Sequence, residues 1–419
     1  MKKIVIVGGG AGGIAAALSA AKSNPDAHVM ILEGLDRVGK KILATGNGHC
    51  NLTNEYIDEK CYHSKNKELL KAYIEKMPSS MSIEFFEELG LYSSSDDAGR
   101  VYPYCRQATM VLDILLLALK RYGIDVRCEQ KVSDISFKNN MFYVRTKSGE
   151  EYKADRVIIT TGGKAAPKQG SDGSGYALAE KFGHKYNYLF PSLVPLQCKG
   201  NVFKGLKGIR VLCRTDLFVD GKKTASERGE LQLTDYGVSG IPAMQLSCFL
   251  EKNASNGKAQ VGIDFFPDMN YEELRKIVFD RIRIYPKETL ENIFLGLINK
   301  RVLFAMLKYL SIEPLSRTAD SLTKKETDLL VSTLKMWKFE VTGTLSWDFA
   351  QVTGGGIKLE EIDENFESVY RKGLYIAGEI LDVTGDCGGY NLHWAWCSGI
   401  MAGRSAALNE YFLQVKNGY

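Results

Sequence analysis

The sequence lacks the cysteine spacings that a disulfide framework, a zinc site or a redox pair would need. Its nine cysteines are odd in number, and no two of them form a CxxC motif. Small secreted domains and zinc ribbons carry regularly paired cysteines, so both classes are excluded. The cysteine usage predicts reduced thiols in a cytoplasmic protein without a metal site.

Long apolar runs are missing as well. The longest ones fall well short of the roughly 20 residues that span a bilayer. The first strand-like run begins at residue 3, where the charged and apolar parts of a signal peptide would lie. We therefore expect no membrane insertion and a cytoplasmic location.

Charge of one sign is also scarce. The chain has 54 Lys and Arg against 50 Asp and Glu, a formal net charge of +4, and its basic residues are spread along the sequence. This balance does not indicate a nucleic-acid partner or an anionic membrane surface, so neither is expected. A chain of 419 residues exceeds what one core usually supports, which predicts two or three domains.

A glycine-rich turn between a predicted strand and a predicted helix dominates the N-terminal region. The apolar run KIVIV at residues 3–7 is followed by GGGAGG at 8–13 and by an alanine-rich helix candidate at 14–22. A second apolar run at 28–32 ends in Glu33, twenty residues past Gly13. This order is the dinucleotide-binding fingerprint in the context that it requires.

Each glycine of the fingerprint has its own physical task. Gly8 allows the tight turn, Gly10 lets the backbone approach a pyrophosphate, and Gly13 lets the helix pack close to the strand. The helix N-terminus then faces the phosphates, and Glu33 is placed to bind the ribose hydroxyls. The alternative is a glycine-rich turn with no ligand.

The fingerprint alone does not distinguish NAD from FAD, but the loop after the acidic residue does. Residues 37–54 read RVGKKILATGNGHCNLTN, a long segment rich in Gly, Asn and Thr that also carries Lys40 and Lys41. A nicotinamide dehydrogenase would normally continue here into an ordinary crossover. The loop suits a second set of contacts to a larger, extended cofactor, so FAD is the predicted ligand.

Periodicity also divides the remainder of the chain. Short strand-like runs at 124–132, 141–146 and 151–154 predict a small meander, and RVIIT at 156–160 predicts another buried strand. Further along, strand-like segments dominate up to residue 267, helical periodicity follows, and strand-like residues return near 339.

These changes of pattern predict a split domain. The predicted domains are an FAD-binding domain of residues 1–190 and 349–419, a β-rich inserted domain of 191–267 and 337–348, and a helical inserted domain of 268–336.

Several motifs together resemble one known family. They are GKKILATGNGHCNLTN (39–54), GSDGSG (170–175), GELQLTDYGVSGIPA (229–243), QVTGGGI (351–357) and GLYIAGEILDVTGDCGGYNLHWAWCSGIMAG (373–403). The chain resembles, from residue 3 to about residue 403, the bacterial FAD-dependent oxidoreductases that include aminoacetone oxidase and 3-dehydro-bile-acid Δ4,6-reductase. The resemblance implies an α/β fold with a Rossmann-like, two-dinucleotide-type FAD domain interrupted by a β-barrel-like domain and a small helical domain.

The resemblance also implies where the cofactor contacts lie. The fingerprint would hold the AMP half, the following loop would border the pyrophosphate, ribityl chain and flavin, and the helix N-terminus after residue 388 would face the flavin pyrimidine edge, where it stabilises negative charge. The implied cofactor-binding residues are Gly8, Gly10, Ala11, Gly12, Gly13, Glu33, Lys40, Lys41, Thr45, Gly46, Asn47, Asn51, Val132, Thr161, Gly162, Gly163, Glu379, Gly388, Gly389, Tyr390, Asn391 and Leu392.

No catalytic acid, base or nucleophile follows from the sequence, but four polar residues are candidates: His49, His393, Arg100 and Tyr102. Relatives often have Arg or another residue in place of His49 and Gln in place of His393, so both histidines are expected near the cofactor with altered proton handling. The alternatives are a backbone-bonded loop histidine for His49, a neutral polar contact for His393, and loop anchors for Arg100 and Tyr102.

Two reactions of the resembled family compete as the predicted function. One is NAD(P)H-dependent reduction of an activated C=C bond, as in a 3-oxo-steroid or bile-acid intermediate, and the other is O₂-dependent oxidation of a small amino-ketone. No second complete GxGxxG is present, so any nicotinamide would share the flavin pocket. A tRNA-binding flavoprotein and a non-catalytic flavin module are alternatives from other classes, and the sequence does not set the oligomeric state.

Overall fold

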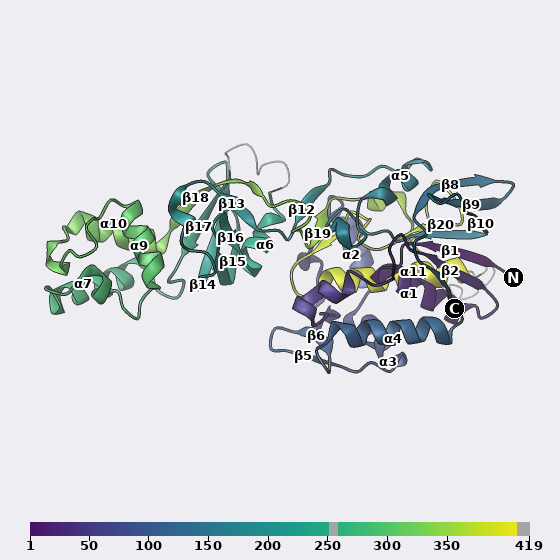
Figure 1. Ribbon diagram of the computed structural model, residues 1–419, viewed down its shortest axis with the longest axis horizontal. Coiled ribbons are helices and arrows are strands. Elements are labelled where there is room, and N and C mark those ends of the chain that lie inside the picture. Colours follow the sequence, from purple (N-terminus) through teal and green to yellow (C-terminus); the bar gives the residue numbers. More distant parts are fainter. Residues whose placement is uncertain (251–258, 409–419) are drawn as a thin grey trace. The chain divides into compact units, whose positions relative to one another are not determined.

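The chain forms two compact units in the computed structural model, which describes residues 1–250 and 259–408 (Figure 1). Unit 1 joins Met1–Pro191 with Ala350–Tyr419, and unit 2 is the intervening Ser192–Phe349. Residues 251–258 of the predicted β-rich domain and 409–419 of the predicted FAD domain lie outside the described residues. The division into three domains stays a prediction.

A five-stranded parallel sheet forms the centre of unit 1. Ile6 lies beside Ile31 on one neighbouring strand and Ile158 on the other, and all three side chains are fully buried. A sheet covered on both faces requires such continuous apolar strands. The predicted α/β class with a Rossmann-type sheet is confirmed. The sheet order is β20 (Leu374–Ile376), β11 (Arg156–Ile159), β1 (Lys3–Val7), β2 (His28–Leu32) and β7 (Asp125–Arg127).

The prediction of one meander strand over residues 124–132 is wrong. The segment contributes to two sheets, because β7 joins the parallel sheet beside β2 whereas β8 (Val132–Lys138) begins an antiparallel sheet with β9 (Met141–Thr146) and β10 (Glu151–Ala154). Glu129, between the two strands, has a left-handed backbone with φ of 58°. A left-handed residue of this kind interrupts an extended strand, but the pattern of apolar residues does not show where it lies.

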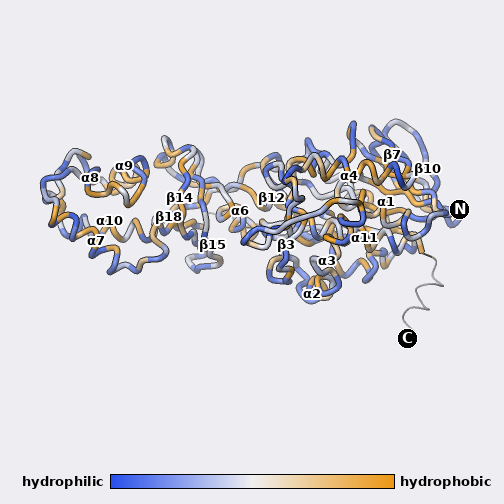
Figure 2. Tube along the Cα trace, turned by 90° about the horizontal axis from the view of Figure 1, so that it is seen from below, coloured by the Kyte–Doolittle hydropathy of each residue, from blue (hydrophilic) through white to orange (hydrophobic). Residues whose placement is uncertain are grey.

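Helices α1 and α11 pack against each other with very little separation. A Cβ atom at Gly399 would lie 2.3 Å from the Gly12 carbonyl oxygen, and one at Gly403 would lie 2.1 Å from that of Ala16. Only glycine permits this approach, and the two helices lie side by side in Figure 1 and in Figure 2. The helices of unit 1 are α1 (Ala11–Ser23), α2 (Lys67–Glu75), α3 (Ser79–Glu88), α4 (Ala108–Arg121), α5 (Ser174–Glu180) and α11 (Tyr390–Ala407).

Small sheets of two or three strands hold the loops of unit 1. They consist of β3 (Thr53–Asn54), β6 (Arg100–Pro103) and β5 (Ser93–Ser95) in one sheet, β4 (Tyr62–His63) with β21 (Thr384–Gly385), and β12 (Phe190–Ser192) with β19 (Val352–Gly354).

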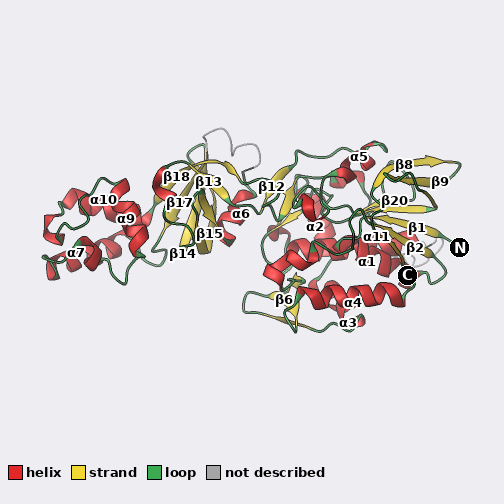
Figure 3. Ribbon diagram, viewed as in Figure 1, coloured by secondary structure: helices red, strands yellow, loops and turns green. Residues whose placement is uncertain are grey.

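Unit 2 contains a closed antiparallel barrel, seen beside its helices in Figure 3. The barrel strands, in order around the barrel, are β13 (Leu196–Cys198), β16 (Gly237–Ser239), β15 (Lys222–Leu233), β14 (Arg210–Val219), β17 (Ala259–Asp264) and β18 (Trp337–Thr344). The helices of this unit are α6 (Ile241–Ser247), α7 (Tyr271–Ile284), α8 (Leu290–Ile293), α9 (Lys300–Tyr309) and α10 (Lys324–Lys335).

The barrel and the helices of unit 2 share one apolar cluster. Trp337 and Phe339 of β18 belong to the same buried group as Leu303 of α9 and Leu330 of α10. A capping box begins α10, in which Thr323 and Glu326 exchange hydrogen bonds with each other's backbone N–H. The helical segment is thus folded onto the barrel through a common core.

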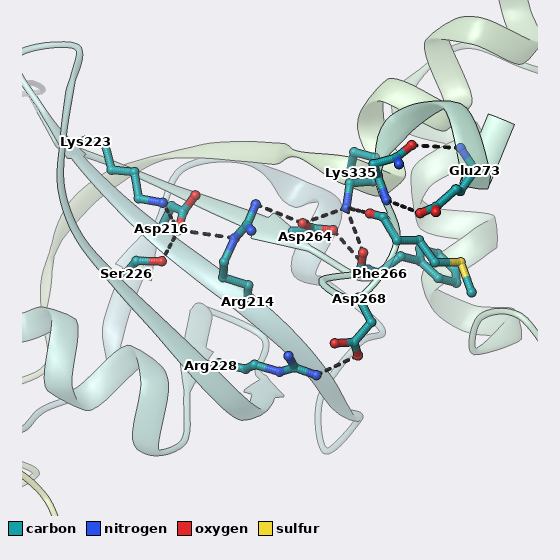
Figure 4. Close-up of polar contacts among 12 residues, drawn as sticks. Arg214, Asp216, Lys223, Ser226, Arg228, Asp264, Phe266, Asp268, Glu273 and Lys335 are labelled. Atoms are coloured by element: carbon teal, nitrogen blue, oxygen red, sulfur yellow. Dashed lines mark hydrogen bonds and ion pairs between the residues drawn. The ribbon is translucent and has the colours of Figure 1, made fainter.

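A network of charges around two buried carboxylates, Asp216 and Asp264, also joins these elements (Figure 4). Asp264, fully buried at the end of β17, accepts ion pairs from Arg214 at 3.0 Å and from Lys335 at 2.9 Å. Asp216 lies 2.9 Å from Lys223 and 3.6 Å from the Nε atom of Arg214. Buried carboxylates need such partners because an unpaired charge would be expensive to desolvate.

Candidate functional site

The N-terminal glycine turn has the geometry that a phosphate cradle needs. Gly8 has a φ of 102°, and a Cβ atom at Gly13 would lie 1.9 Å from the Gly8 carbonyl oxygen. By contrast, a Cβ atom at Gly10 would meet nothing within 4 Å. Gly10 is the N-cap of α1, and no side chain caps this helix end. The turn is therefore tightly packed at Gly8 and Gly13 and has free space beside Gly10.

Glu33 is held in place at the end of β2. Its Oε2 atom accepts a hydrogen bond from the Gly9 N–H at 2.7 Å, and its Oε1 atom accepts one from the Leu35 N–H at 2.8 Å. The Gln130 N–H donates to the Glu33 carbonyl at 2.8 Å, which brings the start of β8 at Val132 to this corner of the sheet. The fingerprint, Glu33 and the start of β8 thus lie at one corner of the sheet. Their role in binding the AMP half of a cofactor stays a prediction.

The loop after Gly39 is wound into an irregular 3₁₀ segment, Ile42–Gly48. Gly46 and Asn47 have φ angles of 55° and 54°, and Cys50 has one of 55°. Left-handed backbones outside glycine store strain that the surrounding structure must maintain, and they gather at functional sites. Thr45, in the same segment, donates its hydroxyl to the Ile42 carbonyl at 2.6 Å.

Asn51 follows this loop and has a polar atom without a partner. Its side chain is buried, and among the described residues its Oδ1 atom accepts no hydrogen bond. A Cβ atom at Gly389 would lie 2.8 Å from this Oδ1 atom, so Asn51 lies at the beginning of α11. A buried acceptor of this kind is costly unless a ligand supplies a donor.

Lys41 and Glu379 meet although 338 positions separate them. Lys41 Nζ lies 2.7 Å from Glu379 Oε2 and also donates to the Ala165 carbonyl at 3.2 Å. Lys40 takes no part in this cluster, since its only ion pair among residues 1–250 and 259–408 is with the exposed Asp36 at 3.4 Å.

Thr353, which the sequence analysis missed, completes the Lys41–Glu379 cluster. It donates its N–H to Glu379 Oε1 at 3.1 Å, and its hydroxyl oxygen accepts from the Lys164 N–H at 2.7 Å. A Cβ atom at Gly163 would lie 2.2 Å from that hydroxyl and 3.2 Å from Glu379 Oε1. The Val352-Thr-Gly motif was the only signal, because nothing local links it to residue 379.

Thr161 and Gly162 flank the Lys41–Glu379 cluster, but the Thr161 side chain and the Cβ position of Gly162 point toward Gly175 and Ser171 instead. Thr161 Oγ1 is buried and has no hydrogen-bond partner within residues 1–250 and 259–408. It lies 1.8 Å from where a Cβ atom of Gly175 would be, against the start of α5. A Cβ atom at Gly162 would lie 2.7 Å from Ser171 Oγ. Both residues therefore contribute backbone rather than side chain to the cluster side of this loop.

The N-terminus of α11, like that of α1, begins at a glycine and has no side-chain cap. Gly388 and Gly389 have φ angles of 136° and 100°, Gly389 is the N-cap, and no side chain caps the helix. Asn391 is occupied within the loop, because its side chain exchanges hydrogen bonds with the Gly385 N–H and carbonyl at 2.8 and 2.7 Å. Tyr390 packs edge-on against Tyr62, and Leu392 is half-buried.

His393 is enclosed rather than exposed at this helix end. Its Nδ1 atom lies 2.8 Å from the hydroxyl of Thr53 and 2.9 Å from that of Ser82, and its Nε2 atom lies 2.9 Å from the Met77 carbonyl. The carbonyl can only accept, so Nε2 carries the proton and Nδ1 accepts from the hydroxyls. Burial lowers the pKa of His393 to about 4, against the smaller opposing effect of the Met77 carbonyl. The geometry is that of the neutral polar contact.

The other three candidate residues divide between two arrangements. Arg100 donates its Nε–H to Asp96 at 2.9 Å, and its Nη2 atom lies 2.8 Å from the same carboxylate, as a loop anchor would. Tyr102 and His49 instead lie together, edge-on, with ring centroids 6.4 Å apart. Arg106, which the sequence analysis missed, stacks its guanidinium 5.0 Å from the Tyr102 ring centroid.

A His–Asp pair near α11 was also missed. His63 Nε2 lies 2.8 Å from Asp386 Oδ1, and both side chains are about one quarter exposed, at 28% and 24%. Pairing of β4 with β21 brings them together. The only signal was the position of Asp386 in the Gly385–Gly389 loop, because residue 63 lies in an unremarkable segment.

Two negative findings complete the description of the site. Within residues 1–250 and 259–408, no three His, Cys, Asp or Glu side chains are grouped as metal ligands would be. No helix of that same part of the chain has the length and apolarity needed to cross a bilayer.

The comparisons with known proteins agree on one relationship. Residues 2–405 match the family described as HI0933-like protein Rossmann domain. The chain is 39% identical to the 3-dehydro-bile acid delta(4,6)-reductase of Clostridium scindens, over 97% of this chain and 99% of that one. It is 28% identical to the ribosomal RNA dihydrouridine synthase of Haemophilus influenzae, over 94% and 96%.

A solved structure shares the fold. It is the 3-ketosteroid-delta4-(5alpha)-dehydrogenase of Rhodococcus jostii, with a TM-score of 0.51, 16% identity and coverage of 97% of both chains. The similarity to a reductase along nearly the whole chain confirms the prediction of an oxidoreductase. The chain belongs to the HI0933-like Rossmann family.

Proposed function

We propose that this oxidoreductase binds FAD and reduces a carbon–carbon double bond conjugated to a carbonyl group, with a 3-oxo-steroid or bile-acid intermediate as substrate and NAD(P)H as the diffusible reductant. The observation that carries FAD is the stagger of two uncapped helix N-termini in unit 1. Gly399 packs on Gly12 and Gly403 packs on Ala16, so α1 and α11 run parallel, and Gly12 also lies against Ala395. The N-terminus of α11 therefore extends past that of α1 by about five residues, roughly 8 Å.

Two staggered positive helix ends suit an extended dinucleotide. The N-terminus of α1, with the space at Gly10, would hold the pyrophosphate, and Glu33 would bind the ribose of the AMP half. The N-terminus of α11 and the unpaired acceptor Asn51 Oδ1 would border the flavin. A nicotinamide cofactor alone would leave the second helix end and the strained Gly46–Cys50 loop without a role.

The polar residues between these helix ends fit the middle of FAD. Lys41 would bind the pyrophosphate as a point charge, and Glu379, positioned by Thr353, would accept hydrogen bonds from the ribityl hydroxyls. When bound, FAD supplies hydride transfer between its N5 atom and the substrate. The chain binds and orients both partners, and the α11 N-terminus stabilises negative charge at the pyrimidine edge.

The reaction type is supported by the activities of the relatives. A Δ4,6-reductase of a 3-dehydro bile acid saturates double bonds conjugated to a ketone. A dihydrouridine synthase saturates the uracil double bond that is conjugated to a ring carbonyl. In chemical terms the two activities are the same reduction on different rings, so double-bond reduction is a better proposal than amino-ketone oxidation.

Anaerobic flavin spectroscopy tests this proposal. NAD(P)H should bleach the visible flavin band of the purified protein, and a 3-oxo-4,6-diene steroid should restore it with formation of the saturated product. An amino-ketone that bleaches the flavin, followed by fast recovery on addition of O₂, would replace the proposal with the oxidase. A flavin that no donor bleaches would contradict both reactions.

A second candidate substrate is uridine in RNA, because of one observation on charge. Unit 2 contains 23 Lys and Arg against 19 Asp and Glu, so the whole formal excess of +4 falls in this unit. The sequence analysis took the charge as dispersed, but the two units are not alike. Binding of ribosomal RNA that weakens steeply with salt, and dihydrouridine formed in that RNA, would favour this candidate.

A further inference from the structure

His49, Tyr102 and Arg106 form one exposed cluster on unit 1, which we call the oxyanion rim. Arg106 and His49 are exposed and Tyr102 is half-buried. The guanidinium of Arg106 lies over the Tyr102 ring at 5.0 Å, and the His49 ring meets the same ring edge-on at 6.4 Å. The Tyr102 ring keeps the guanidinium plane in one orientation by a cation–π contact.

Two side chains of the oxyanion rim, Arg106 and Tyr102, keep their polar groups available, whereas His49 is bonded to the Arg106 carbonyl. Among the described residues, neither the Arg106 guanidinium nor the Tyr102 hydroxyl has a hydrogen bond or an ion pair with a protein group. Arg100, six residues before Arg106 in the sequence, shows the contrast, because Asp96 pairs with its guanidinium at 2.8 Å. A planar, uncommitted guanidinium beside a phenol is suited to bind an oxyanion through two parallel hydrogen bonds.

The rim is positioned at a cost in backbone energy. Arg106 has a left-handed φ of 50°, and the loop that carries His49 contains Asn47 and Cys50 at 54° and 55°. The two loops are joined because His49 Nδ1–H donates to the Arg106 carbonyl at 2.7 Å. Strained residues that a specific contact holds in place are typical of binding sites.

The rim also adjoins the proposed flavin loop. A Cβ atom at Gly46 would lie 3.6 Å from Tyr102 Cε1 and 3.1 Å from the Asn51 N atom. The same glycine thus contacts the ring of the rim on one side and the residue with the unpaired buried acceptor on the other. A ligand bound at the rim would reach from the surface toward that loop.

We propose that His49, Tyr102 and Arg106 bind an oxyanion of the substrate, and so orient its unsaturated ring toward the flavin loop. The proposal rests on the proposed function and deepens it, because it makes the substrate an acid. A steroid carboxylate and an RNA phosphate are two sources of the same oxyanion chemistry. Arg106 is the specificity-determining residue, because only a fixed fork of donors matches a carboxylate or phosphate.

The test measures binding by titration calorimetry of the flavin-loaded protein. The ligands are a 3-oxo-4-ene bile-acid carboxylate and its uncharged methyl ester, and the variant is Arg106→Gln, which keeps the side-chain length. Arg121→Gln removes another exposed arginine of unit 1 as the matched control. The wild type should prefer the acid about tenfold or more. Arg106→Gln should abolish this preference by weakening acid binding alone, and Arg121→Gln should leave it unchanged.

A second arm identifies the source of the oxyanion. For a short uridine-containing oligoribonucleotide, Arg106→Gln should lower the slope of log affinity against log salt by about one if a phosphate contacts the rim. If Arg106→Gln loses the preference for the steroid acid over its methyl ester, the oxyanion that binds the rim is a carboxylate. If the variant changes the salt slope of RNA binding, that oxyanion is a phosphate. If Arg106→Gln weakens acid and ester equally, or changes neither arm, the proposal is wrong.

Two further measurements keep this test separate from other failures. Thermal unfolding must give the same midpoint for wild type and Arg106→Gln, and Arg106→Lys, with one point charge, should keep part of the preference. A further outcome is that the wild type prefers the acid over the ester as expected while none of the bound ligands reoxidises the reduced flavin. That result would contradict double-bond reduction and would still support oxyanion binding at the rim.

Discussion

Lys335, in the last turn of α10, donates to the fully buried carboxylate of Asp264 at 2.9 Å. The same ammonium donates to the carbonyls of Phe266 and Met269 at 2.7 and 2.5 Å. All three donor positions of Lys335 are thus used on the end of β17 and the turn that follows it. This single side chain ties the helical part of unit 2 to the barrel.

We expect Lys335→Met to destabilise unit 2 by about 2–4 kcal/mol. The substitution would leave Asp264 with Arg214 as its only cationic partner among the described residues and would take the Lys335 donor away from two carbonyls. Breaking one side of a buried ion pair is expensive. Urea unfolding measures the change, and Lys324→Met on the exposed first turn of the same helix is the control. Equal unfolding midpoints for the two variants would show that the network contributes nothing to stability.

Gly10→Val should give a folded protein without FAD. A Cβ atom at Gly10 would meet no protein atom within 4 Å, so the valine would extend into the space proposed for the pyrophosphate. Thermal unfolding of the apoprotein and flavin content after purification measure the two effects. Gly13→Ala is the contrast, because its methyl group would lie 1.9 Å from the Gly8 carbonyl and should lower stability itself. Full flavin occupancy in folded Gly10→Val would refute the cradle.

Glu33→Gln should weaken FAD binding by about tenfold, through roughly 1–2 kcal/mol. Both carboxylate oxygens of Glu33 accept backbone N–H groups, from Gly9 and Leu35, so an amide –NH₂ would face one of these donors. Flavin fluorescence during titration of the apoprotein gives the dissociation constant. Glu84→Gln, on an exposed face of α3, is the charge-matched control, and the same affinity in both variants would remove Glu33 from the site.

His393 should make the protein less stable in acid. Its pKa is about 4 in the folded protein against 6.5 in a free side chain. The unfolded chain then binds the proton more readily, so stability is complete above about pH 6.5 and falls as the pH decreases toward 4, by up to about 3 kcal/mol.

His393→Gln should flatten part of this pH dependence, because its amide can donate to the Met77 carbonyl and accept from the Thr53 and Ser82 hydroxyls without titrating. A remaining acid effect is expected from His184, whose pKa burial also lowers. Unfolding midpoints between pH 4 and 7 measure it. The flavin potential should have the same slope against pH in both proteins, and a steeper slope in the wild type would show that His393 exchanges protons with the cofactor site.

Much of unit 1 could be predicted from the sequence because its signals are local. The runs at β1, β2 and β11 are apolar over their whole length, and the glycines of residues 8–13 lie within one turn. The short range of the strand–turn–helix contacts makes these residues sufficient by themselves. The resemblance added the barrel, which periodicity alone suggested only as a β-rich segment.

The site depended on contacts between distant residues. The Lys41–Glu379 pair and its Thr353 support span more than three hundred positions, and Arg106 joins His49 across 57. His393 follows a glycine loop that suggests exposure, yet Met77 and Ser82 on neighbouring segments enclose it.

The amino-acid sequence by itself therefore determined the Rossmann-type sheet and the glycine turn after its first strand, and it predicted the cofactor. The tertiary structure alone decided which charged and polar side chains are committed to the protein and which remain available to a ligand. The physical reason is that a strand or a glycine turn is set by neighbours in sequence, whereas burial and pairing of a charge depend on whatever the fold brings beside it.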